Sequence, residues 1–243
     1  MIRLPIFACV FLSLVGIHFE PVSAGLILQQ PGPDIFVSGG VDYRFDSVLN
    51  SNRLMVGGDA SQFRASDGST QDIYFGTLPS TGVGDGIASD IAALLPGYPV
   101  DSRGFFVLDA EFNRSGSFAS GYFQVLGYLG DSAGPTSSAG TVTLLKGTLR
   151  EIDTALSDAG LLNFVADNLE GTLAGLYSGQ AGIAIGGLPQ GYSFLSTDFQ
   201  VSSITADIGR PVPEPVSLAV WSSAIAIGTF GCRPRRRIEI LPI

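Results

Sequence analysis

Among the residues of the chain, two carboxylates are the best candidates for a catalytic pair. Asp109 and Glu111 lie two positions apart in the alternating run 106–112, whose other face is apolar. Residues i and i+2 of a strand share a face, so these acids would lie side by side, as the acid–base carboxylates of glycosidases do. Acids on a strand are far more often a solvated surface. We therefore predict no catalytic residue and a non-enzymatic protein, with a carboxylate-based glycoside hydrolase as the remoter alternative.

Further aspartates occur in glycine-rich stretches and could supply oxygen ligands to calcium. The candidates are Asp59, Asp67 and Asp72, and separately Asp85 and Asp90. No stretch has the complete Asp-x-Asp-x-Asp-Gly pattern, and acidic loops also keep a weakly charged domain soluble. We predict no cofactor and no metal ligand, and calcium is the one ion left open.

The residues that other common kinds of active site require are missing from residues 25–210. The single histidine, His18, and the two cysteines, Cys9 and Cys232, fall outside residues 25–210. Nucleophile–histidine triads and zinc sites of the usual ligands are therefore excluded from this region. The glycines of 82–86 have no following lysine, so no phosphate-binding loop is predicted.

Aromatic side chains offer a last candidate, because exposed rings can stack on sugars. Most should be core residues in a domain with few leucine-rich helices. The candidates, as a set, are Phe105, Phe106, Tyr122, Phe123, Tyr128, Tyr177, Tyr192 and Phe194.

The charge balance limits the partners. Residues 25–210 contain 8 Lys+Arg against 19 Asp+Glu, a net charge of −11. Such a domain repels phosphate backbones and anionic membrane surfaces, so nucleic-acid binding is not expected.

The elements that would position these side chains are short strands. Strand-like runs are expected at 41–45, 54–56, 72–78, 106–112, 117–128, 141–152, 161–166, 171–177, 181–185, 192–195 and 199–208. Asn113 to Gly116 should be a hairpin turn, 57–70 and 131–140 loops, and 90–95 one or two helical turns. This spacing, without a series of amphipathic helices, favours a mainly β fold. We predict an antiparallel β-sandwich or jelly-roll-like domain.

The first 24 residues have the pattern of a signal peptide. Arg3 precedes an apolar run over 4–17, and small residues end it at Ala24. Signal peptidase would therefore cleave between Ala24 and Gly25. We expect a helical signal segment over 1–24 and a β-rich domain outside the cytoplasmic membrane over 25–210.

The last residues have the order of an anchor. The proline-rich linker 211–215 contains Pro213, Glu214 and Pro215, and 216–232 follows without a charge. As a helix, these 17 residues would span about 25 Å, the short end for a membrane. Arg233, Arg235, Arg236 and Arg237 then open the tail 233–243 and would hold it in the cytoplasm.

This order, Pro-Glu-Pro, apolar segment and arginine cluster, resembles the PEP-CTERM sorting signal of bacteria, also labelled an ice-binding-protein C-terminal domain. The resemblance covers about residues 212–237. Pro234 within the cluster and the extension 238–243 depart from the usual pattern. The resemblance implies an exosortase-type membrane enzyme as processing partner, and many such systems accompany extracellular polysaccharide and biofilm genes. No regular Thr-x-Thr array accompanies it, so ice binding is not expected.

Together these observations predict an exported cell-surface or matrix protein that is anchored by its C-terminal segment until it is processed. Association with extracellular polysaccharide is the expected setting. The alternative is a module that binds carbohydrate or calcium.

Overall fold

The computed structural model describes residues 28, 32–45, 52–77, 102–130, 140–194 and 198–212. This part of the chain forms strands and two short 3₁₀ helices, with no α-helix among the residues described. The elements are β1 (Asp34–Phe45), β2 (Asn52–Arg64), β3 (Thr70–Tyr74), β4 (Gly104–Phe112), β5 (Phe118–Leu129), β6 (Val142–Asp153), η2 (Ser157–Ala159), β7 (Leu161–Glu170), η3 (Ala174–Tyr177), β8 (Ala181–Gly186) and β9 (Phe199–Gly209).

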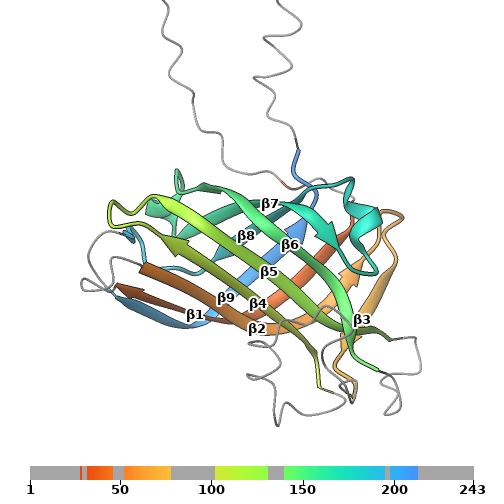
Figure 1. The fold of residues 1–243 in the computed structure, drawn as a ribbon. Coiled ribbons are helices and arrows are strands. Elements are labelled where there is room, and N and C mark those ends of the chain that lie inside the picture. The colour runs from red at the N-terminus through yellow and green to blue at the C-terminus, as the bar shows by residue number, and fades with distance from the viewer. Residues whose placement is uncertain are drawn as a thin grey trace, which may run out of the picture.

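Eight of the strands form one closed antiparallel barrel (Figure 1). β1 pairs with β2, β2 with β4, and each later strand with the next, until β9 pairs back with β1. β3 stands outside this ring and pairs at its two ends with β2 and β5. The predicted β-sandwich or jelly roll is therefore wrong. The first and last strands hydrogen-bond to each other, so a single sheet closes on itself instead of facing a second sheet.

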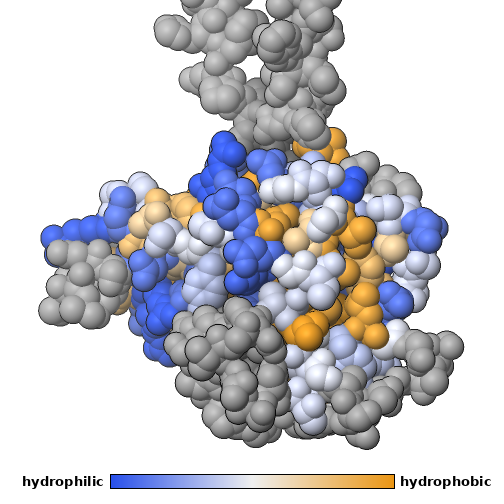
Figure 2. Space-filling model, turned by 45° about the vertical axis from the view of Figure 1, so that its right-hand side comes forward, coloured by the Kyte–Doolittle hydropathy of each residue, from blue (hydrophilic) through white to orange (hydrophobic). Residues whose placement is uncertain are grey.

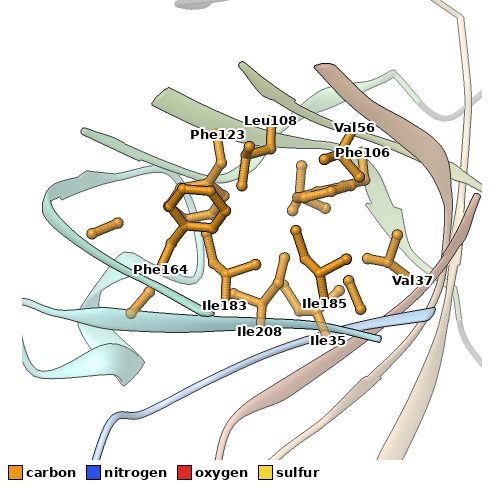
Figure 3. Close-up of a cluster of buried hydrophobic side chains, with 14 of the residues drawn as sticks. Ile35, Val37, Val56, Phe106, Leu108, Phe123, Phe164, Ile183, Ile185 and Ile208 are labelled. Carbon is orange, nitrogen blue, oxygen red and sulfur yellow. The ribbon is translucent and has the colours of Figure 1, made fainter. Parts of the chain in front are cut away.

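The interior of the barrel is filled by alternate residues of all eight strands. Figure 3 shows side chains from opposite walls meeting in the middle, among them Phe106 and Phe123 from one side and Ile183 and Ile208 from the other. These four are fully buried. Burial of one such side chain contributes about 1.5–3 kcal/mol, so the packed interior is the main source of stability.

Aromatic side chains close one end of the barrel. Phe194, from the connection between β8 and β9, stacks on Phe112 with ring centroids 4.1 Å apart. Its carbonyl oxygen accepts hydrogen bonds from the Tyr43 hydroxyl (2.6 Å) and from Asn52 Nδ2 (3.2 Å). Burial raises the pKa of Tyr43 to about 12, so this hydroxyl remains a donor at neutral pH.

Tyr177 of η3 closes the other end. It is buried, and its hydroxyl donates to the carbonyl oxygen of Ile208 at 3.2 Å. Among the described residues, packed side chains therefore occupy both ends of the barrel as well as its middle.

Glycines let β1 and β2 approach closely. Gly39 faces Gly58 across the ladder, and Gly40 faces Gly57. A Cβ on Gly39 would overlap the carbonyl oxygen of Gly57, and one on Gly58 would overlap that of Ser38. Fully buried Phe106 is the partner of Gly58 on β4. The missing side chains thus make room for both the backbone contact and a large neighbour.

Several sequence-based elements are corrected. The predicted loop 57–70 is strand as far as Arg64, because the Gly57–Gly58 pair belongs to the ladder and does not end it. The predicted strand 171–177 is a turn followed by η3, and 192–194 is connection. The hairpin turn Asn113 to Gly116 is confirmed by the Gly116 N–H donating to Asn113 O at 2.9 Å.

Other predictions lie outside the described residues: the helices at 1–24, 90–95 and 216–232, and most of the loop 131–140. Within the part of the chain that the structure covers, no helix has the length and apolarity needed to cross a membrane.

We expect Gly58→Ala to lower the free energy of unfolding by about 2 kcal/mol, because the new methyl group overlaps strand β1. Gly57→Ala is the matched control, since nothing lies within 4 Å of its Cβ position. The control should be neutral or stabilising by about 0.5 kcal/mol. Urea unfolding of both variants measures the difference, and equal stabilities would contradict the close-contact interpretation.

Candidate functional site

The predicted carboxylate pair lies on the outer wall of the barrel. Asp109 and Glu111 do share a face of β4, as the alternation predicts, opposite Tyr122 and Ser120 of β5. Arg53 of β2 binds both oxygens of Asp109, with its Nε 2.8 Å from Oδ1 and its Nη2 bound to Oδ2. The Asp109 side chain is 9% exposed, and that of Arg53 is 51% exposed.

This geometry is that of an ion pair that joins two strands. The hydrogen bond that Arg53 donates to Asp109 raises the pKa of Arg53, so the guanidinium stays charged and holds the carboxylate. Glu111 accepts a hydrogen bond from Ser120 Oγ at 3.2 Å. Both carboxylate oxygens of Asp109 are bound by Arg53, and such a bidentate pair fixes the geometry of both side chains, so the arrangement favours a structural role.

The described calcium candidates are dispersed. Asp67 lies in the turn after β2 and accepts from Ser69 N (2.8 Å) and Ser69 Oγ (2.6 Å), which lowers its pKa. Asp59 faces Phe105 across the β2–β4 ladder, and Asp72 lies on β3. Asp85 and Asp90 fall outside the described residues. Among the residues that are described, no group of three or more His, Cys, Asp or Glu side chains is placed to hold a metal ion.

The structure shows which of the aromatic candidates are buried and which are partly exposed, a distinction that the sequence alone does not give. Phe106, Phe123, Tyr177 and Phe194 belong to the buried core, and Tyr192 packs against it. Phe105, Tyr122 and Tyr128 are partly exposed. Strand alternation places Phe105 and Tyr122 on the outer wall, because their neighbours Phe106 and Phe123 point inward.

Tyr128 belongs to a cluster of four side chains that we call the β3 cluster: Asp72, Tyr74, Arg103 and Tyr128. Tyr74 is the cross-strand partner of Tyr128 on one side and forms a β-bridge with Arg103 on the other. The two tyrosine ring centroids are 5.9 Å apart at 37°. The Arg103 guanidinium carbon lies 5.5 Å from the centroid of the Tyr74 ring.

Asp72 connects these residues. Its Oδ2 accepts from Arg103 Nη1 and from the Tyr74 hydroxyl, each at 3.1 Å. The hydrogen bond from Arg103, followed by that from Tyr74, lowers the pKa of Asp72. Arg103 is 44% and Asp72 39% exposed, so the charged groups stay in contact with solvent. The sequence analysis did not identify Tyr74 and Arg103 as candidates, because only strand pairing brings them together in space.

The surface around β3 and η3 is chemically mixed. Figure 2 turns this side of the molecule forward and shows hydrophobic residues in a band between hydrophilic ones. Leu176 of η3 is one of the exposed large hydrophobic residues. A surface of this kind has both apolar area and hydrogen-bonding groups to offer a ligand.

A second charged group lies where β1, β2 and β9 meet. Asp34 pairs with Arg64 (Oδ2 to Nη2, 2.8 Å) and is buried. Asp207 lies diagonally across the β1–β9 ladder, since Asp34 faces Gly209 and Phe36 faces Asp207. Burial, and next the negative charge of Asp34, raises the pKa of Asp207.

Comparison of the chain with protein-family models, curated proteins and solved structures gave no match.

We expect Asp207→Asn to stabilise the barrel at pH 7. A carboxyl whose pKa is raised by folding adds most to stability below its unfolded pKa, and this contribution is lost as the pH rises through the folded pKa. Removing the charge should therefore gain about 0.2–1 kcal/mol at pH 7 and less at pH 4, where the raised pKa leaves more of the wild-type carboxyl protonated than at pH 7. Urea midpoints at both pH values measure this.

The exposed Asp158, on η2, provides the matched control as Asp158→Asn. A variant at Asp207 that loses stability at pH 7, or gains equally at both pH values, would contradict the explanation by burial and by the negative charge of Asp34.

Proposed function

We propose that this chain is an exported, non-enzymatic cell-surface or matrix protein. The N-terminal signal segment 1–24 would carry the barrel across the cytoplasmic membrane, and the C-terminal sorting signal would hold it there until an exosortase-type enzyme processes the tail. Association with extracellular polysaccharide is the setting we propose for the exposed barrel. The second candidate is a carbohydrate-binding module, favoured by the β3 cluster.

The observation that carries this proposal is the filled barrel. Phe194 and Tyr177 close its two ends, and apolar side chains occupy the space between them. A ligand chamber of the kind found in wider barrels requires a lumen. Among the described residues, the surfaces left for recognition are on the outside, which suits a displayed protein.

The two ends of the barrel domain support the same proposal. Leu28 and Pro211 form an antiparallel bridge, so the chain enters and leaves the barrel at one place. Pro213, Glu214 and Pro215 follow within a few residues of that bridge. An anchor attached there would leave the rest of the outer wall free to face away from it.

The test is the mass of the mature protein from its native host. We expect an N-terminus at Gly25 and loss of the residues that follow the Pro-Glu-Pro motif. In the variant Pro213→Ala/Pro215→Ala the C-terminal segment should remain, because the processing enzyme no longer recognises the motif. Pro211→Ala is the matched control, since it changes a linker proline outside the motif.

An intact C-terminus in the membrane fraction of the wild type would overturn the processing step. Equal processing of the double variant and the control would show that the Pro-Glu-Pro motif is not what the enzyme reads.

A further inference from the structure

β3 is not needed to close the barrel. β2 pairs directly with β4, and β4 with β5, so the ring is complete without it. β3 nevertheless lies along the ends of β2 and β5 as a five-residue addition. Its inward residue, Ile73, is fully buried, and alternation turns Asp72 and Tyr74 to the opposite face.

Three glycines allow the neighbouring backbone to pack closely against β3. A Cβ on Gly104 would overlap Cγ2 of Ile73, and one on Gly127 would lie 2.9 Å from the same atom. A Cβ on Gly130 would overlap the ring of Tyr74. The Gly130 N–H also donates to the carbonyl oxygen of Asp72 at 2.8 Å. The backbone of the neighbouring strands therefore fixes both the strand and the position of the Tyr74 ring.

The result is a fixed pair of tyrosine rings beside an exposed arginine and a partly exposed aspartate. A pyranose ring has an apolar C–H face that stacks on an aromatic ring, and a rim of hydroxyl groups. Tyrosine supplies a large amphipathic surface with little side-chain entropy to lose. Arg103 can donate to hydroxyl oxygens, and Asp72 can accept from hydroxyl hydrogens.

The charges of the barrel region and of the β3 cluster favour neutral saccharides over anionic ones. The barrel region has 19 acidic against 8 basic residues, which repels polyanions. Arg103 is partly neutralised by Asp72, with 3.1 Å between Nη1 and Oδ2. The cluster therefore suits an uncharged sugar ring better than a uronate or a sulfated sugar.

We propose that the β3 cluster binds a neutral polysaccharide, with a sugar ring stacked on Tyr128 beside Tyr74 and its hydroxyl groups bound by Asp72 and Arg103. This inference rests on the proposed association with polysaccharide and gives that association a site.

The test is affinity electrophoresis of the full chain, purified in detergent, in gels that contain one polysaccharide each. The probes are the neutral polymers β-glucan, galactan and mannan, and the polyanion alginate. We expect at least one neutral polymer to retard the wild type. Tyr128→Ala should weaken that retardation by about tenfold in the association constant, as expected for the loss of one stacked ring. Tyr128→Phe should keep most of the binding.

Tyr122→Ala is the matched control, because this partly exposed tyrosine of β5 lies near the Arg53–Asp109 pair and outside the cluster. A second variant, Gly130→Ala, displaces the Tyr74 ring without removing a ligand group and should also weaken binding. Thermal unfolding of each variant shows whether the barrel is folded.

Several outcomes would overturn the proposal: no neutral polymer retards the chain, only alginate does, or a folded Tyr128→Ala binds as tightly as Tyr122→Ala. A protein that is exported and processed but binds none of the polymers would overturn this inference and leave the sorting proposal intact. Binding of a neutral polymer by a chain whose tail is never processed would leave this inference intact and overturn the sorting proposal.

Discussion

The barrel depends on β1 pairing along both of its edges. It forms one ladder with β2 and another with β9, the last strand of the described chain. This requires β1 to approach both neighbours closely while the sheet curves. Gly39 and Gly40 make that approach possible, because side chains there would overlap β2 or crowd the Val201 carbonyl of β9. This local absence of side chains accommodates closure, and closure leaves the ring without a free edge.

Closure decides what the remaining residues can do. Once the sheet forms a ring, alternate residues point into an interior that is occupied by packed side chains from opposite walls. The other residues face outward, where the charged groups form pairs such as Arg53–Asp109 and Lys146–Glu170. The carboxylates that suggested catalysis are thus part of the outer wall, and one of them holds two strands together. On the outside, β3 adds a surface that the ring itself does not need.

Much of the local structure could be predicted from the sequence. The alternation in 106–112 gives the face of each residue correctly, and the hairpin to β5 follows from Asn113 and Gly116. Glycine was harder to interpret. Gly57 and Gly58 suggested a loop but lie within a strand, whereas Gly171 and Gly179, on either side of η3, have positive φ. The same residue serves both purposes, and only its neighbours in space show which applies.

The sequence by itself determined the β class of the fold, the absence of histidine and cysteine from residues 25–210, and the Pro-Glu-Pro segment with its arginine cluster. These properties depend on composition and on spacing along the chain. Only the tertiary structure decided that one sheet closes on itself, which aromatic rings are buried, and that Tyr74, Arg103 and Tyr128 are neighbours. These properties depend on strand pairing between residues that are far apart in the chain. Alternation fixes which side of a strand a residue faces but not which strand lies next to it.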